Sequence, residues 1–494
     1  MIKRLVFFVS AWVILTFQTG AGQSVWSPQE KESGFNCFTI LVGKNATDQG
    51  CVYMAHNEDD YGPQLVNWII EPGKHYPEGI ELELKNGGKL AQVETTNRFI
   101  WLEMPGMDFS DSYLNEYGVC IASNSCPSRE DHPEITDGGI GYRLRGLMAE
   151  RATSARDAVR IAGTLIEQFG YTGSGRTYSV ADPNEAWAIS VVRGKHWVAH
   201  RVPDDEVMVL PNNYMITNVD LSDTENFMGS KDLIKYAIQR GWYDPDRDGD
   251  FNFRKAYAST GSMKHPANIN RAWGAYYLFD AGIKINGNYP FSFKPKKKVS
   301  KEKLMQVLSS HYEGTPLDKS KGYTLGSPYK LNGSMICGKA SVYSFVAELR
   351  NWMPADIGCV LWLAPQWSDI QPFIPWYAGT VSVPSAFARP DYPKSFKDHY
   401  HPPKDIRTPN DRHAFWTFVA FSDYMNRHYG EKIEAVKKYR NKIEKTLLKK
   451  QKKIERKALK KYQKDPESAR TFLTGYTDKL AEFTYKYTAK QINK

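Results

Sequence analysis

In Cys37–Asp60 the sequence reads CFTILVGKNATDQGCVYMAHNEDD, two apolar runs on either side of a polar stretch. The runs CFTILVG and CVYMAHN are rich in β-branched and aromatic residues, and the polar stretch holds Asn, Asp and Gly. The pattern therefore predicts two strands joined by a turn. The first strand starts at Cys37, and a buried cysteine in a strand is ordinary. If the peptide bond before Cys37 is cut, however, its α-amino group becomes a base beside the thiol.

The residues before this stretch have the layout of an export signal. A basic pair, Lys3 and Arg4, precedes an apolar run that ends in small residues. This layout predicts a signal peptide over residues 1–22 and a polar leader over residues 23–36 that is removed on maturation. The apolar run is shorter than the roughly 20 residues of a membrane-spanning helix, although an uncut anchor is the alternative. We expect an exported protein, periplasmic or secreted.

The positive charge of the chain is unevenly distributed. The formal net charge is +10, from 65 Lys and Arg against 55 Asp and Glu, and the excess lies between Glu431 and Lys464. Apolar residues in that segment recur at spacings of three or four, which predicts an amphipathic helix. We therefore predict a catalytic domain over residues 37–430 and a basic helical extension over residues 431–494.

The basic extension has two interpretations. A solvated helix docked on the catalytic domain explains the charge without a partner, and association with an acidic cell-envelope surface is the alternative. Nucleic acid is not an expected partner, because the chain has an export signal and no aromatic motif interleaved with the basic residues.

The body of the chain alternates between strand-like and helical patterns. Short strand-like runs follow Cys37, a helical pattern covers residues 142–169, and strand-like runs return after it. Two strand-rich regions around a helical pair predict an α+β protein built in layers.

Further segments extend the pattern of the opening stretch. They are DSYLNEYGVCIASNS (residues 111–125), KHWVAHRVPDDEVMVLPNN (195–213), NINRAW (268–273) and MPADIGCVLWLAPQWSDIQPFIPWYAG (353–379). In this order the chain resembles the dipeptidase A and secernin family of N-terminal nucleophile cysteine hydrolases, from about Cys37 to Tyr429. The resemblance implies an αββα four-layer sandwich, in which two antiparallel sheets lie face to face between helices.

The resemblance also implies a nucleophile and its partner. Cys37 matches the N-terminal nucleophile of the family, and Asp59 matches the acid that holds the nucleophile's α-amino group. Such an amino group titrates near 8 when unperturbed, so it is a usable base at neutral pH. The alternative is that Cys37 is a buried core residue with no catalytic role.

Three other positions match polar residues of the family's site. Asn124 and Asn212 match asparagines that line the oxyanion site, and Asn213 is a one-residue alternative for the second. Arg271 matches an arginine near the nucleophile. An amide N–H directed at a developing oxyanion lowers the barrier by a few kcal/mol. Each of these residues also has a structural explanation, as a turn cap or a surface charge.

One position departs from the family pattern. The chain has His56 where relatives carry arginine. A protonated His56 would favour the thiolate, and a neutral one would act as a hydrogen-bond partner. The departure also opens a rival mechanism, a direct Cys37–His56 pair in an unprocessed chain.

A second acidic motif raises the question of a metal. DPDRDGDFN places Asp244, Asp246, Asp248 and Asp250 as in the start of a calcium-binding loop. Lys255 stands where such a loop needs glutamate, so this is a weak calcium candidate, and a solvated turn is the alternative. We expect no cofactor. The chain has six cysteines, which allows at most two disulfides if Cys37 is a working thiol.

Together these features predict an exported cysteine dipeptidase. It would cleave amide bonds of dipeptides or small peptides through a thioester acyl-enzyme on Cys37. The alternatives are an acylase for non-peptide amides of the bile-acid conjugate or penicillin type, and a non-catalytic surface-binding protein that uses the basic helix. We expect small peptides as substrates and a homo-oligomer as the assembly.

Overall fold

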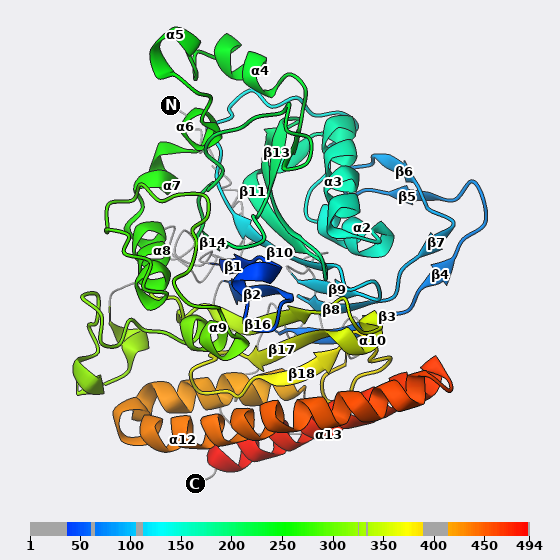
Figure 1. Ribbon diagram of the computed structural model, residues 1–494, viewed down its shortest axis with the longest axis vertical. Helices are drawn as coiled ribbons and strands as arrows, with labels where there is room; N and C mark the ends of the chain where they lie inside the picture. The colour runs from blue at the N-terminus through cyan, green and yellow to red at the C-terminus, as the bar shows by residue number, and fades with distance from the viewer. Residues whose placement is uncertain are drawn as a thin grey trace, which may run out of the picture.

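Two antiparallel β-sheets lie face to face at the centre of the molecule (Figure 1). The structure is a computed structural model, and it describes residues 37–60, 65–104, 112–324, 326–331, 334–388 and 413–492. The predicted signal peptide (1–22) and leader (23–36) lie outside the described residues, so both remain predictions.

The first sheet contains the opening stretch of the sequence. Its six strands lie in the order β14 (Val207–Leu210), β1 (Phe38–Val42), β2 (Val52–Asp59), β16 (Ser341–Leu349), β17 (Cys359–Pro365) and β18 (Ile374–Tyr377). Strands β1 and β2 are the predicted pair, and Thr39 lies opposite His56 in their register. Every residue of both strands is buried, because the sheet is covered on both faces.

The second sheet has eight strands. Their order is β15 (Phe227–Gly229), β13 (Trp197–Arg201), β12 (Ala186–Gly194), β11 (Tyr171–Ala181), β10 (Cys120–Ser125), β9 (Tyr113–Asn115), β8 (Phe99–Glu103) and β3 (Asn67–Glu71). Asn124 of β10 lies opposite Thr177 of β11. Two small hairpins, β4 (Lys74–His75) with β7 (Thr95–Thr96) and β5 (Glu81–Glu83) with β6 (Lys89–Ala91), project beside this sheet.

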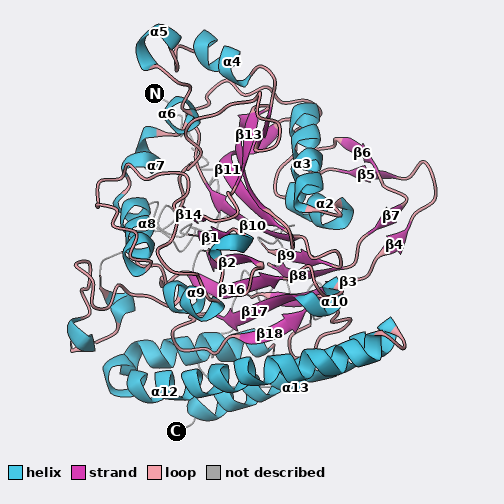
Figure 2. Ribbon diagram, in the orientation of Figure 1, coloured by secondary structure: helices cyan, strands magenta, loops and turns pink. Residues whose placement is uncertain are grey.

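Helices cover the outer face of each sheet (Figure 2). The helices α2 (Arg143–Arg151) and α3 (Ala155–Phe169) pack on the eight-stranded sheet, where Ser154 caps α3 by accepting from the Asp157 amide. On the six-stranded sheet lie α9 (Lys301–Leu308), α10 (Ala355–Gly358) and the C-terminal helices. The four layers confirm the predicted α+β class and the αββα sandwich.

Shorter helices connect the two sheets. They are α4 (Leu233–Gln239), α5 (Pro245–Asp248), α6 (Phe253–Tyr257), α7 (Thr260–Lys264), α8 (Pro266–Leu278) and the 3₁₀ turns η1 (Lys44–Ala46), η2 (Lys321–Tyr323) and η3 (Pro328–Lys330). Of these, α8 matters most for the site, because it carries Arg271 into the buried core.

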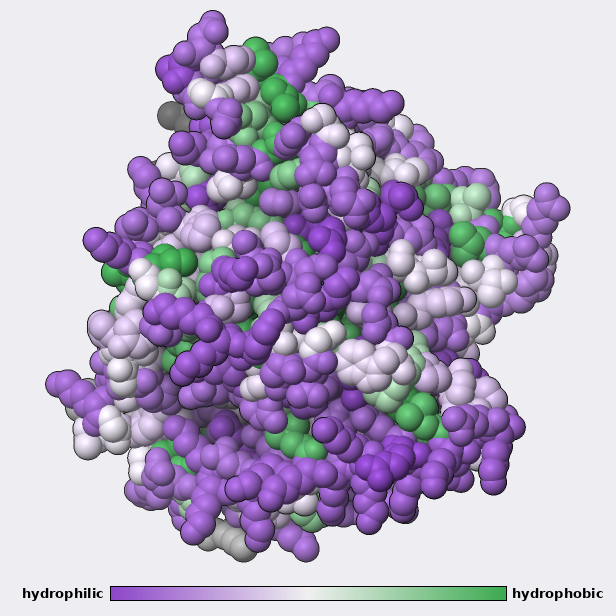
Figure 3. Space-filling view, in the orientation of Figure 1, coloured by the Kyte–Doolittle hydropathy of each residue, from purple (hydrophilic) through white to green (hydrophobic). Residues whose placement is uncertain are grey.

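The C-terminal region forms an antiparallel helical hairpin along the outer side of the six-stranded sheet (Figure 1). Its helices are α12 (Ala414–Tyr462) and α13 (Pro466–Ile492). Helical geometry in α12 is broken at His428 (φ −119°, ψ 21°), close to the boundary predicted after residue 430, which stays a prediction. Leu447 and Ala458 face the body and are buried, whereas hydrophilic side chains cover the outward face of the hairpin (Figure 3). None of the helices described is long and apolar enough to cross a membrane.

Candidate active site

Cys37 lies immediately before β1, at a point where both sheets and α8 meet. Its side chain is 1% exposed, and its Sγ lies 3.3 Å from Glu58 Oε1 and 3.5 Å from the Asp59 carbonyl oxygen. The Cys37 carbonyl oxygen accepts from Asn124 Nδ2 at 2.7 Å and from Arg271 Nη1 at 3.0 Å. The structure thus brings the predicted nucleophile, Asn124 and Arg271 together from segments far apart in the sequence.

Asp59 is the last residue of β2, and its two carboxylate oxygens differ in their hydrogen bonding. Its Oδ1 accepts from Ser341 Oγ at 2.6 Å. Its Oδ2 is buried and has no hydrogen-bond partner among the residues the structure describes. Burial raises the pKa of Asp59 to about 7. A buried acceptor without a donor is costly, so this oxygen is suited to accept from one further donor.

The two predicted oxyanion residues have different surroundings. Asn124 Nδ2 is occupied, because it donates to the Cys37 and Leu210 carbonyl oxygens. Asn212 uses its Oδ1 to accept from Arg271 Nη2 at 2.9 Å, and its Nδ2 is buried without a partner within the described ranges. The alternative residue, Asn213, faces α7 instead, where its Oδ1 accepts from Ser262 Oγ at 3.3 Å. Asn212 therefore offers an amide donor, whereas Asn124 positions the backbone of Cys37.

Arg271 links these groups from α8. Besides Cys37, its guanidinium donates to Asn212 Oδ1 at 2.9 Å and Asn268 Oδ1 at 3.0 Å. His265 caps the helix through its side chain and Pro266 occupies the first turn, which fixes where α8 starts. The guanidinium is fully buried and its planar donors are all directed at fixed acceptors, so it positions Cys37 and Asn212 relative to each other.

His56 does not contact the thiol directly in this arrangement. Its Nδ1 lies 2.8 Å from Thr39 Oγ1, and its Nε2 lies 2.9 Å from Glu58 Oε2. Glu58 therefore stands between His56 and Cys37. The sequence analysis missed Glu58, although strand alternation could have found it, since residues i and i+2 of β2 share a face.

Burial controls the electrostatics of this group. It raises the pKa of the Cys37 thiol and of Glu58 well above their ordinary values, and it lowers the pKa of His56 to about 3. The nearby carboxyl groups of Glu58 and Asp59 raise the thiol pKa further. In the full chain the site is thus an unreactive thiol beside a protonated acid and a neutral imidazole.

Two buried arginines oppose the rise in pKa that burial causes, and the sequence analysis missed both. Arg145 of α2 and Arg176 of β11 each lower the pKa of Glu58, and Arg176 also lowers that of Cys37. Arg176 donates from Nη1 to Ser123 Oγ at 2.8 Å, on the strand that carries Asn124. Neither arginine belongs to a recognisable motif, and only the pairing of β10 with β11 brings Arg176 to the site.

The acidic loop forms a capped turn around α5. Asp244 accepts from the Asp246 amide, and Asp248 accepts from the Asp244 amide. Arg247 forms ion pairs with both Asp244 and Asp248. The weak calcium candidate, which also included Asp250, therefore uses two of its carboxylates for backbone and arginine contacts.

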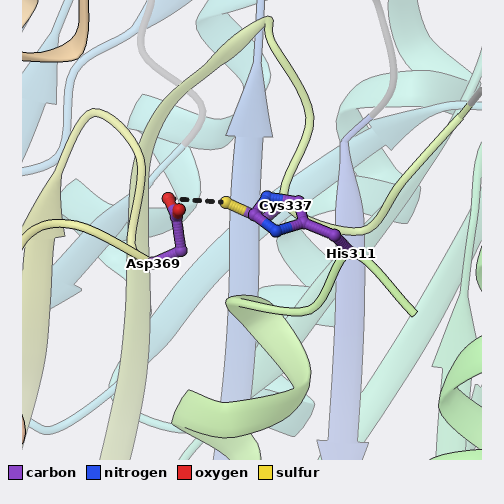
Figure 4. Close-up of side chains that lie close together, drawn as sticks. All are labelled: His311, Cys337 and Asp369. Atoms are coloured by element: carbon purple, nitrogen blue, oxygen red, sulfur yellow. Dashed lines mark hydrogen bonds between the residues drawn. The ribbon is translucent and has the colours of Figure 1, made fainter. Parts of the chain in front are cut away.

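A second buried cysteine cluster lies between the body and α12 (Figure 4). His311, Cys337 and Asp369 hold their potential ligand atoms within 4.8 Å of one another, the one such group among the described residues. Both oxygens of Asp369 already accept from tyrosines, Tyr329 at 2.5 Å and Tyr429 at 2.6 Å. Because Tyr429 belongs to α12, this network ties the C-terminal hairpin to the body.

Comparison with known proteins decides the family. The profile described as Peptidase family C69 matches residues 121–442. The chain belongs to peptidase family C69. It is therefore a peptidase, and the predicted resemblance is confirmed. All six cysteines of this C69 peptidase are free and buried.

Curated relatives support this assignment. Dipeptidase A of Lactobacillus helveticus is 28% identical over 374 residues, which cover 71% of this chain and 77% of the relative. A probable dipeptidase of Latilactobacillus sakei is 25% identical over 409 residues, covering 80% and 82% of the two chains.

Solved structures give weaker matches. Penicillin V acylase from Agrobacterium tumefaciens is 14% identical with a TM-score of 0.31, covering 67% of this chain and 82% of the other. A mutant of conjugated bile acid hydrolase from Clostridium perfringens is 12% identical with a TM-score of 0.33, covering 67% and 89%.

Proposed function

We propose that this C69 peptidase is an exported cysteine dipeptidase with Cys37 as an N-terminal nucleophile. Removal of residues 23–36 would free the α-amino group of Cys37, which then serves as the base. The observation that carries the proposal is the open Asp59 Oδ2, a buried acceptor without a donor among the described residues. Leader removal creates a donor at Cys37, and an ammonium beside Asp59 would lower its pKa and hold the amine in position.

The catalytic steps follow from the neighbours of Cys37. The free amine takes the thiol proton, and the thiolate attacks the carbonyl carbon of the substrate amide. The Asn212 amide donor is available for the oxyanion, while Arg271 and Asn124 hold the Cys37 backbone. The amine then protonates the leaving nitrogen, and water hydrolyses the thioester.

The dipeptide substrate class is supported by the relatives. Dipeptidase A of Lactobacillus helveticus and the dipeptidase of Bifidobacterium longum carry that activity in their names. Export is supported by the basic pair and apolar run at the N-terminus. The exposed lysines of α12 support association with an acidic envelope surface.

A substrate panel tests the proposal. Purified protein should hydrolyse a set of dipeptides and lose that activity on alkylation of Cys37. Acylated amides without a dipeptide backbone should be poor substrates. Hydrolysis of penicillin-type or bile-acid-type amides at higher kcat/KM than any dipeptide would replace the dipeptidase proposal with the acylase alternative.

A further inference from the structure

Five side chains around Cys37 form a closed circuit of hydrogen bonds. From the thiol it runs to Glu58 Oε1 at 3.3 Å, and from Glu58 Oε2 to His56 Nε2 at 2.9 Å. From His56 Nδ1 it runs to Thr39 Oγ1 at 2.8 Å, and from Thr39 to Asn124 Oδ1 at 2.6 Å. Asn124 Nδ2 then returns to the Cys37 carbonyl oxygen at 2.7 Å.

The direction of each hydrogen bond can be worked out from the fixed donors and acceptors. Asn124 Nδ2 faces two carbonyl oxygens, so its Oδ1 is the atom that faces Thr39. The Thr39 hydroxyl donates to that oxygen, so it must accept from His56, whose Nδ1 carries a proton. If the imidazole is neutral, its Nε2 is an acceptor and Glu58 must donate to it. Glu58 is then a carboxylic acid, with Oε2 as donor and Oε1 as acceptor of the thiol proton.

The charges around Glu58 agree with this assignment. The carboxyl is fully buried, and burial together with nearby Asp60 favours its protonated form. The other groups that act on it or are affected by it are Cys37, His56, Arg145 from α2, Arg176 from β11 and Tyr343 from β16, and Asp59 acts on the Cys37 thiol. Arg176 favours a negative charge on the thiol, and a thiolate beside the pair would favour protonated His56 against the effects of burial and Arg145.

Leader removal needs such a relay. In the full chain the Cys37 nitrogen is part of a peptide bond, so the base of the mature enzyme does not yet exist. A thiol with a raised pKa cannot attack without a proton acceptor. The acceptor in contact with Sγ is Glu58.

We propose that Glu58 relays the Cys37 thiol proton to His56, and that this relay drives removal of the leader. The proposal rests on the N-terminal nucleophile function proposed above. Glu58 is the catalytic residue of this step because it touches the thiol. His56 is the terminal acceptor, and Thr39 is a positioning residue that holds the His56 tautomer.

The proposed leader removal needs no reactant other than water. The thiol proton passes to Glu58 Oε1 as the Oε2 proton passes to His56 Nε2, which leaves a thiolate, a neutral acid and an imidazolium. The thiolate attacks the Asn36 carbonyl carbon, the C–N bond to Cys37 breaks, and the proton returns through Glu58 to the departing nitrogen. The resulting thioester is hydrolysed by water, which releases the leader as a carboxylic acid and restores the thiol.

Glu58→Gln is the sharpest test, because glutamine preserves the resting hydrogen bonds. Its amide can donate to His56 Nε2 and its oxygen can accept from the thiol, but it cannot pass a proton between its two atoms. We expect leader removal, followed by intact mass over time, to slow by about 10²- to 10⁴-fold. The rate in the variant should rise about tenfold per pH unit, since it then depends on the thiolate fraction, whereas the full-length wild type should show a shallow pH profile.

Thr39 supplies a matched pair of variants. Thr39→Ser keeps the hydroxyl that accepts from His56, and Thr39→Val removes it with little change in shape. We expect Thr39→Val to slow leader removal about tenfold or more and Thr39→Ser to restore most of the rate. Equal rates of leader removal in the two variants would show that Thr39 does not hold the His56 tautomer.

A second experiment distinguishes failure of this relay from failure of the proposed N-terminal nucleophile function. In full-length protein, the residues just before Cys37 are replaced by the recognition sequence of a protease that cuts directly before Cys37. After that cut, wild type should hydrolyse dipeptides without having removed its own leader, because the free amine is then the base. Wild type that is cut but inactive would overturn the N-terminal nucleophile function. Active, cut wild type together with unimpaired leader removal in uncut Glu58→Gln would overturn the relay alone.

Discussion

The protein buries two cysteines beside a carboxylic acid and a histidine, and the two groups behave in opposite ways. Cys37 Sγ lies 3.3 Å from Glu58, and Cys337 Sγ lies 3.6 Å from Asp369. Burial lowers the pKa of His56 to about 3. At the second cluster burial also disfavours charge, but hydrogen bonds to Cys337 and Glu313 and the charge of Asp369 raise the pKa of His311 to about 10.

The difference lies in how many donors each acid receives. Asp369 accepts from two tyrosine hydroxyls, and His311 Nδ1 lies 3.5 Å from a second acid, Glu313 Oε1. Glu58 faces only the weak thiol donor and an imidazole, so it stays protonated. The Asp369 hydrogen bonds join α12 to the body, whereas the proposed relay requires that Glu58 keeps a transferable proton. The same residue types therefore serve stability in one place and chemistry in the other.

The largest expected contrast is between the two cysteines themselves. Cys37→Ala should abolish peptide hydrolysis, since the acyl-enzyme bond cannot form, and should leave the melting temperature nearly unchanged. Cys337→Ala should keep kcat and lower stability by about 1 kcal/mol through the lost packing and contacts. Dipeptide hydrolysis and thermal unfolding of both variants check this, and an inactive but folded Cys337→Ala would break the comparison.

Substitution of the aspartate beside each cluster should give the same contrast, with a loss of stability at one cluster and a loss of activity at the other. Asp369→Asn removes a charge that favours the His311 cation and the acceptor of two tyrosine hydroxyls, although Glu313 still pairs with His311, so we expect a loss of about 3–5 kcal/mol in the free energy of unfolding. Asp59→Asn should reduce kcat at least about tenfold with a smaller loss of stability, because its open oxygen is reserved for the amine. Urea unfolding and kcat measured on both variants test the contrast. A stable Asp369→Asn would show that the second cluster is not an ionic joint.

The two histidines predict stability changes at opposite ends of the pH scale. The pKa of His311 is raised from 6.5 to about 10, so its contribution is complete below pH 6.5 and is lost as pH rises toward 10. The pKa of His56 is lowered from 6.5 to about 3, so the unfolded state binds more protons below pH 6.5 and stability falls as pH drops toward 3. We expect His311→Gln to flatten the alkaline limb of the curve of unfolding free energy against pH, and His56→Gln to flatten the acid limb. If either variant kept both limbs, the assigned charge state of that histidine would be wrong.

A smaller effect than that of Asp369→Asn is expected on the α12 side of the second cluster. Tyr429→Phe removes one hydrogen bond to Asp369 and should cost about 1.5–3 kcal/mol, because the acceptor is charged. Activity should be unchanged. Tyr277→Phe in α8 is the control, since Tyr277 is 46% exposed and its loss should be within about 0.5 kcal/mol. Similar Tm values for the two variants would show that Tyr429 does not secure the helix.

The sequence predicted the parts of the site that lie in short, ordered motifs. The strand pair that begins at Cys37 is visible as alternating runs, and the family resemblance supplied the sandwich and the residues that meet at Cys37. Glu58 was missed because a glutamate between Asn57 and Asp59 has no pattern of its own, although it shares a face with His56. Arg145, Arg176 and the His311 cluster could not be found, because only tertiary packing brings them together. The apolar helical segment of α12 before the break at His428 was not predicted, since its residues resemble those of the body.

The mass of the N-terminal peptide of active protein tests the central claim most directly. The protein is purified in the form that hydrolyses dipeptides, and its first residue is read by mass spectrometry. The account predicts that the chain starts at Cys37, and that Cys37→Ala retains residues 23–36 if the cut is autocatalytic. Full activity in a chain that still carries Asn36 before Cys37 would contradict the free-amine mechanism. It would leave the Glu58–His56 pair as the base of the reaction.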